Sequence, residues 1–175
     1  MKKAEVAVVM GSDSDLEVMA DAAKVLDELA ITYEVFVLST HRAPEETAAL
    51  AKSAKERGFK VIIAGAGGAA ALPGSLASLT PLPVIGVPIK SKSLEGLDSL
   101  LSIVQMPSGV PVATVGIDAA KNAGILACEI IALSDSKIAK NLADYKRNLK
   151  SQVLAKNVKI RKLSWQKYLK LISKK

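Results

Sequence analysis

Short apolar runs alternate with helical segments along the first 133 residues, and this alternation constrains the fold more than any other feature. The apolar runs occupy residues 5–10, 33–38, 61–64, 83–87 and 110–115. Segments with helical spacing of apolar residues separate them, at 13–29, 44–57, 97–104 and 119–133. Nearly uninterrupted apolar strands are typical of a parallel sheet that helices cover on both faces. The sequence therefore predicts an α/β fold with a central, doubly wound parallel sheet.

Charge divides the chain into two parts. Residues 134–175 carry 13 Lys/Arg and 2 Asp/Glu, a net charge of +11, whereas residues 1–133 carry 11 and 15, a net charge of −4. Within the basic part, one apolar stripe recurs at helical spacing. Its members are Ile138, Leu142, Tyr145, Leu149 and Val153. We predict an α/β domain over 6–133 and a basic C-terminal helical arm over 134–175 that packs at an oligomer interface.

Composition argues against several classes of function. Aromatic residues make up only 3% of the chain, too few for the stacking platforms of many nucleic-acid binders. One cysteine and one histidine cannot build a disulfide framework or a typical zinc site, so we expect no metal. No apolar stretch is long enough to span a membrane, and the first residues do not resemble a signal peptide. We therefore expect a cytoplasmic protein with no membrane or nucleic-acid partner, although a basic tail that touches RNA remains an alternative.

Three loops are expected at the carboxyl ends of strands, where open parallel sheets bind their ligands. The first, residues 11–15, places Ser12 and Ser14 at the start of a helix, where hydroxyls and backbone N–H groups can hold a phosphate. Asp15 could accept hydrogen bonds from ribose hydroxyls. The same residues would also serve as an ordinary helix cap.

The second loop, residues 39–44, contains the only histidine of the chain. His41 could gain and lose a proton near neutral pH, and the adjacent Arg42 could pair with a phosphate. Ser39 precedes them in the same loop.

The third loop is the glycine-rich stretch 65–74, whose small residues leave room for a ligand. It lacks the lysine of a phosphate-binding P-loop and the setting of a dinucleotide-binding motif. Together the three loops predict a site for a phosphorylated small molecule.

Four segments, in order, carry a resemblance to a known family. They are residues 10–15 (MGSDSD), 39–44 (STHRAP), 65–74 (GAGGAAALPG) and 98–107 (DSLLSIVQMP). From about residue 6 to about residue 154 the chain resembles the N5-carboxyaminoimidazole ribonucleotide mutases, the catalytic subunits of phosphoribosylaminoimidazole carboxylase. The GAGGAA sequence resembles the mutase branch, which moves a carboxylate from N5 to C4 of the aminoimidazole ring in purine biosynthesis.

The resemblance implies a flavodoxin-like three-layer sandwich with an extended C-terminal helix, a homo-octamer, and no metal or nucleotide cofactor. It implies that His41 is the catalytic residue of an isomerase, which first protonates the leaving nitrogen and then removes the C4 proton. The implied ligand contacts are Ser12, Ser14 and Arg42 for the phosphate and Asp15 for the ribose. Around the base and the CO2 the implied lining is Ser39, Ala66, Gly67, Gly68 and Leu72.

One position departs from the family pattern, which has a histidine where this chain has Ala71. A methyl group neither donates a hydrogen bond nor carries a proton. A non-catalytic ribonucleotide-binding protein is therefore one alternative. The other is direct carboxylation of aminoimidazole ribonucleotide with CO2, the reaction of the second branch of the family. The resemblance assigns no role to the basic segment 155–175.

Overall fold

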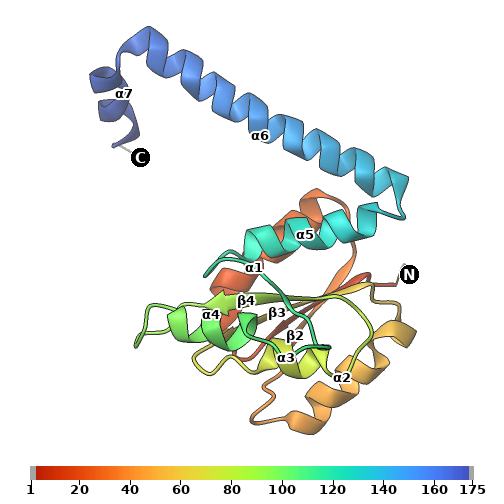
Figure 1. Ribbon diagram of the computed structural model, residues 1–175. Helices are drawn as coiled ribbons and strands as arrows, with labels where there is room; N and C mark the ends of the chain where they lie inside the picture. The colour runs from red at the N-terminus through yellow and green to blue at the C-terminus, as the bar shows by residue number, and fades with distance from the viewer. Residues whose placement is uncertain (1–2, 174–175) are drawn as a thin grey trace.

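Five parallel strands form the sheet at the centre of the computed structural model, which describes residues 3–173 (Figure 1). They lie in the order β2-β1-β3-β4-β5. Their bounds are β1 Val6–Met10, β2 Tyr33–Val37, β3 Val61–Gly67, β4 Val84–Ile89 and β5 Ala113–Thr114. This order, in which the first strand sits between the second and the third, is that of flavodoxin-like folds and confirms the predicted fold class.

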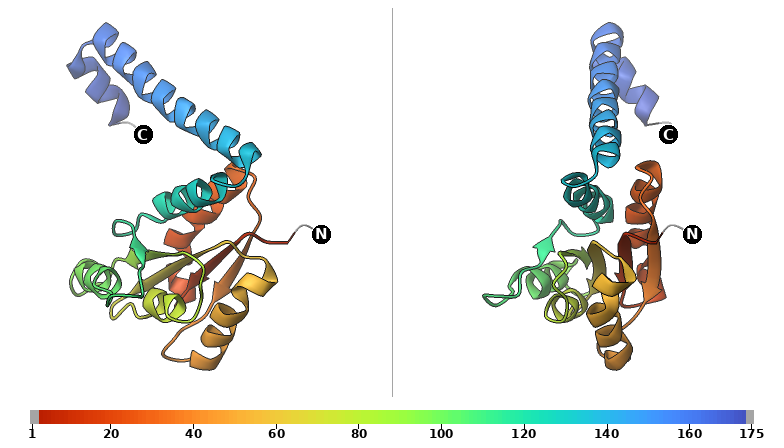
Figure 2. Two further views of the ribbon diagram at one scale, coloured as in Figure 1. Left: turned by 45° about the vertical axis from the view of Figure 1, so that its right-hand side comes forward. Right: turned by 90° about the vertical axis from the view of Figure 1, so that its right-hand side faces the viewer.

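Helices cover both faces of the sheet and make two separate cores. On one face, α1 (Leu16–Glu28) and α5 (Ala120–Ala132) pack on alternate residues of β1, β3 and β4. The opposite face packs against α2 (Pro44–Arg57), α3 (Leu72–Ala77) and α4 (Leu97–Val104). Figure 2 shows these helix layers on either side of the strands.

Three local predictions differ from the structure. The strand predicted at 110–115 is reduced to Ala113–Thr114, since Pro111 has no N–H to donate at this sheet edge. The segment predicted as a glycine-rich loop from residue 65 is still strand as far as Gly67, because it pairs with β1 and β4 on either side. The helix predicted from residue 13 begins as the 3-10 turn η1 (Asp13–Asp15).

Small residues allow the close packing of the first core. A Cβ on Gly65 would lie 2.4 Å from the Met19 sulfur. One on Gly124 would lie 2.9 Å from the carbonyl oxygen of Ala22. Glycine therefore lets α1 approach both the sheet and α5.

The C-terminal arm consists of α6 (Ser136–Leu163) and α7 (Trp165–Ile172). Asp135 caps α6 by accepting from the N–H groups of Lys137 and Ile138 at 2.9 and 3.1 Å. The first turns of α6 pack on α5, and the rest projects away from the body (Figures 1 and 2). Among residues 3–173, none of the helices is long and apolar enough to cross a membrane.

Candidate active site

A cavity of about 480 Å³ opens at the carboxyl ends of β1, β2 and β3. These strands are neighbours in the sheet, so the loops that follow them meet. The lining residues are Gly11, Ser12, Asp15, Ser39, Thr40, His41, Arg42, Ala66, Gly67, Ala70, Ala71 and Leu72.

The first loop is a compact turn in which Ser12 and Asp15 hold each other. The Ser12 N–H donates to Oδ2 of Asp15 at 3.2 Å, and the Ser14 N–H donates to Oγ of Ser12 at 3.3 Å. This reciprocal pattern is a capping box, which fixes the turn at the mouth of the cavity.

Asp15 is half-buried in this turn, and burial raises the pKa of its carboxyl group above the ordinary value. The hydrogen bonds that its side chain accepts from Ser12 N–H and the Ser14 hydroxyl oppose this shift only in part. A desolvated acceptor at the cavity wall suits hydrogen bonds from ligand hydroxyls.

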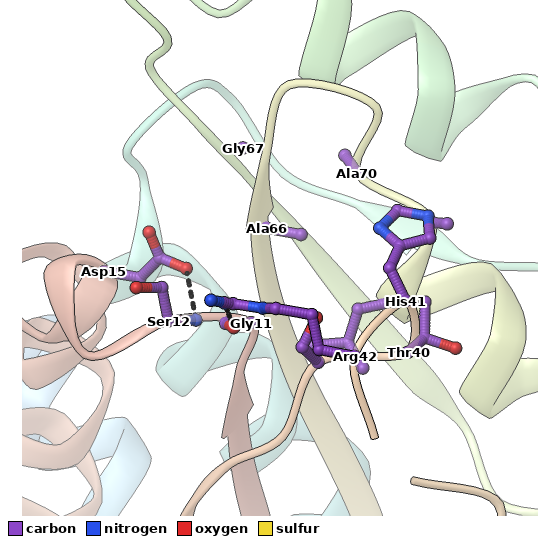
Figure 3. Close-up of a pocket in the computed structure, with 12 residues that line it drawn as sticks. Gly11, Ser12, Asp15, Thr40, His41, Arg42, Ala66, Gly67 and Ala70 are labelled. Atoms are coloured by element: carbon purple, nitrogen blue, oxygen red, sulfur yellow. Dashed lines mark hydrogen bonds between the residues drawn. The ribbon is translucent and has the colours of Figure 1, made fainter. Parts of the chain in front are cut away.

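The second loop contributes two side chains that point to different ends of the cavity. Arg42 extends toward the first loop, where its Nη2 donates to the carbonyl oxygen of Gly11 at 3.0 Å (Figure 3). The imidazole of His41 lies at the other end, beside Ala70 (Figure 3). The cavity therefore has a guanidinium beside the serine turn and an exposed imidazole on the far side.

The third loop contributes backbone and small side chains. Gly68 has φ +62° and Ala70 has φ +25°, so the chain turns sharply between β3 and α3. Ala71 immediately precedes Leu72, the first residue of α3. With only methyl groups and hydrogen atoms along most of this wall, a flat ligand can approach the backbone.

The structure brings most of the sequence-predicted site residues to one cavity. Those lining it are Ser12, Asp15, Ser39, His41, Arg42, Ala66, Gly67 and Leu72. Ser14 and Gly68 do not line it. The exposed Ser14 hydroxyl donates to Asp15 at 3.4 Å, and a Cβ on Gly68 would meet nothing within 4 Å.

Four residues that line the cavity were not among the predicted site residues: Gly11, Thr40, Ala70 and Ala71. Their only signal was position, since each lies inside a loop already selected. Elsewhere, no cluster of metal-ligating side chains occurs within residues 3–173. Cys128 is buried, and burial raises the pKa of its thiol to about 12, as expected of a core residue.

Comparison with known proteins decides the family. The family described as AIR carboxylase matches residues 5–152. This chain belongs to the AIR carboxylase family. All residues that line the cavity fall within the matched range, whereas the end of α6 and all of α7 lie beyond it.

Relatives inside the AIR carboxylase family carry two names. A Pyrococcus abyssi protein named N5-carboxyaminoimidazole ribonucleotide mutase is 58% identical over 94% of this chain and 95% of its own length. A Schizosaccharomyces pombe protein named phosphoribosylaminoimidazole carboxylase is 53% identical over 93% of this chain, which spans 30% of that longer protein. Among solved structures, Treponema denticola PurE superimposes with a TM-score of 0.81 at 29% identity, covering 89% of this chain and 97% of that one.

Proposed function

We propose that this chain is an N5-carboxyaminoimidazole ribonucleotide mutase, an isomerase of purine biosynthesis. The observation that carries the proposal is the position of its only histidine, on the wall of a cavity whose opposite end holds Arg42 and the serine turn. The name and high identity of the Pyrococcus abyssi relative support the same reaction.

The two ends of the cavity suggest how the ribonucleotide binds. Arg42 and the turn that begins at Ser12 would hold the phosphate, since a guanidinium and helix-start N–H groups both favour an anion. Asp15 would accept from the ribose hydroxyls. The ring and the migrating CO2 would then lie near His41, against a wall that Ser39, Ala66, Gly67 and Leu72 build.

The reaction requires one group that both gives and takes a proton. The bond between N5 and its carboxylate breaks, releasing CO2, and N5 gains a proton. C4 then attacks the retained CO2 and loses its own proton, so the net change moves one carboxylate and one proton. Protonated His41 can supply the first proton and, once neutral, remove the second.

Asp15 is less suited to this role, because it lies at the phosphate end and its carboxylate is held by the Ser12 N–H. Ala71 has no proton to give. We therefore assign the complete proton transfer to His41.

Assembly and location belong to the same proposal. We propose that residues 6–133 form the catalytic domain and that the arm over 134–175 joins copies into a homo-octamer, as the resemblance implies. The exposed apolar residues of the arm support an oligomer. We further propose the cytoplasm as its compartment, because its ribonucleotide substrate is an intermediate of nucleotide synthesis.

The test measures C4-carboxylated product from N5-carboxyaminoimidazole ribonucleotide, with His41→Asn as the main variant. Loss of an acid–base group lowers kcat by about 10²–10⁴-fold. Glu56→Gln, at the far end of α2, is the control and should retain activity. Product formed from aminoimidazole ribonucleotide and bicarbonate alone would indicate direct carboxylation. Tight ligand binding without turnover would indicate a non-catalytic protein.

A further inference from the structure

One of the four segments that carry the family resemblance, residues 98–107, has no part in the site described so far. It covers α4 from its second residue and the first residues of the loop that follows. Within it, Ser99 is fully buried although its hydroxyl is polar. A buried hydroxyl lowers stability unless it has a hydrogen-bond partner. The partner of Ser99 therefore shows what this segment holds in place.

The partner of Ser99 is not the usual one for a serine in a helix. Such a hydroxyl commonly donates to the carbonyl oxygen one turn earlier in its own helix. Ser102, on the same helix, does so, and donates to the carbonyl oxygen of Asp98 at 2.8 Å. The Ser99 hydroxyl instead donates to the carbonyl oxygen of Ile89, the last residue of β4, at 2.8 Å. Ser99 therefore ties α4 to the carboxyl end of β4.

The Ile89 carbonyl lies against the wall of the cavity. Strand β4 pairs with β3, and Ile89 is the register partner of Gly67, which lines the cavity. A Cβ on Gly67 would lie 3.5 Å from the Ile89 carbonyl oxygen. The Gly67 carbonyl in turn accepts from the Ala70 N–H at 3.2 Å, which closes the turn of the third loop. The position of the Ile89 carbonyl therefore limits where this wall can lie.

The other end of residues 98–107 contacts the far end of the same loop. A Cβ on Gly74 would lie 3.0 Å from the sulfur of Met106, so Met106 packs directly on α3. Between the two contacts, Ile103 is fully buried in the core that α3 and α4 share. None of residues 98–107 lines the cavity. The segment thus supports the stretch 65–74 at both ends from outside the cavity.

We propose that Ser99 is a positioning residue for the mutase reaction, a role that rests on the function proposed above. By holding the Ile89 carbonyl, its hydroxyl fixes the backbone of Gly67. That backbone belongs to the wall against which the ring and the freed CO2 lie, near His41. Ser99 touches neither the ligand nor His41, and it acts only through Ile89 and Gly67.

The step most sensitive to this wall is the one in which CO2 is free. Once the bond to N5 has broken, no covalent bond holds CO2, and only the fit of the cavity keeps it beside C4. If CO2 leaves instead, N5 keeps the proton it has gained and C4 keeps its own. The products are then aminoimidazole ribonucleotide and CO2, with no added reactant. Escape of CO2 therefore reports on the fit of the wall.

The experiment compares Ser99→Ala with Ser102→Ala in the full chain. The substrate carries ¹³C in its carboxylate, and the buffer contains unlabelled bicarbonate, so CO2 that escapes and returns appears as lost label. The C4-carboxylated product and free aminoimidazole ribonucleotide are both measured, after subtraction of the CO2 loss that occurs without enzyme.

In Ser99→Ala we expect the ratio of escaped CO2 to labelled product to rise about tenfold, since misplacement by less than 1 Å already slows a bound reaction. Ser102→Ala also removes one serine hydroxyl from α4 but leaves the bond to Ile89, so its ratio should match that of the wild type. A lower Tm of Ser99→Ala with an unchanged ratio would overturn the inference, because the tie would then only stabilise α4. An equal rise in both variants would overturn it as well.

A second variant covers the case in which Ser99→Ala does not fold. Ser99→Cys keeps a side chain of similar size, and its thiol is only a weak donor, so its ratio should still exceed that of the wild type. A wild-type ratio in Ser99→Cys would then contradict the role of Ser99. These outcomes are distinct from failure of the proposed function, in which the wild type itself forms no C4-carboxylated product.

Discussion

The two halves of α6 carry the same apolar pattern in opposite surroundings. In the first half, Ile138, Leu142 and Tyr145 are buried at 2%, 8% and 5% exposure. In the second half, Leu149 and Val153 continue the same stripe but are 39% and 63% exposed. The difference lies in the neighbour, because α5 lies beside the first turns of α6 and the rest of α6 projects away from the body (Figure 1).

This contrast extends to the whole molecule. The α/β body closes two cores around its sheet with its own helices. The arm presents apolar residues that its own chain does not cover. Periodicity therefore specifies which face of a helix is buried, whereas the fold decides whether the covering surface comes from the same chain.

The largest effect should come from a matched pair of leucines on α6. Leu142→Ala removes a buried side chain and should lower stability by about 2–3 kcal/mol, or about 5–10 °C in Tm. Leu149→Ala removes the same atoms from an exposed position and should instead make Tm depend more steeply on protein concentration. Differential scanning calorimetry over a hundredfold concentration range measures both.

Similar behaviour of the two variants would contradict the contrast between the buried first half and the exposed second half of α6. Equal losses of Tm that do not change with concentration would mean that the second half of α6 is packed within its own chain. Native mass spectrometry of the same samples provides the control for assembly.

A second prediction concerns the packing inside the body. Gly124→Ala places a methyl group 2.9 Å from the Ala22 carbonyl oxygen and 3.1 Å from Cβ of Val25. The Ala22 oxygen belongs to the backbone and cannot rotate away as a side chain can, so α1 and α5 must move apart locally. We expect a net loss of about 1–2 kcal/mol, even though alanine favours a helix by about 1 kcal/mol. Urea unfolding measures the loss, and an increase in stability would show that this contact is loose.

The junction between body and arm should be less sensitive. Asp135→Ala removes the acceptor for the Lys137 and Ile138 N–H groups and should cost about 1 kcal/mol. Asp135→Ser keeps an acceptor and should recover most of the loss in Tm. If both variants match the wild type, the cap contributes little, and packing on α5 alone holds the start of α6.

Most of the fold could be predicted from the sequence, because the apolar runs of the strands and the apolar spacing of the helices are pronounced. Strand runs and helix spacing predicted four of the five strands closely, together with α2, α4 and α5. The sequence was insufficient where neighbours override local preference. Gly65 and Gly67 lie in a strand because β1 and β4 pair with them. Helix α3 was missed because six residues are too few to show a period.

For the candidate site, position at the strand ends was enough to predict which loops meet at the cavity. It was not enough to predict which residues within those loops line it. Ser14 and Gly68 were predicted from their place in these loops and from the family resemblance, yet neither lines the cavity. Thr40 and Ala70 have unremarkable chemistry and enter the cavity only through the path of the backbone. Direction within a short loop depends on dihedral angles that residue types do not determine.

The smallest predicted effect is a dependence of stability on acidic pH that arises in the body. Residues 148–172 of the arm have no carboxylate side chain that could contribute to it. Burial raises the pKa of Asp15, so the folded chain holds this proton to higher pH than the unfolded chain does. The ionised carboxylate therefore lowers stability at neutral pH, and this penalty disappears as the pH falls below the ordinary pKa of aspartate. Asp15→Asn keeps an acceptor for the Ser12 N–H and removes the charge. Because solvent screens a half-buried group, we expect a gain of only about 1 °C in Tm at neutral pH that vanishes in acid. Thermal unfolding at both pH values measures it, and a gain that persists in acid would mean that burial does not penalise the charge.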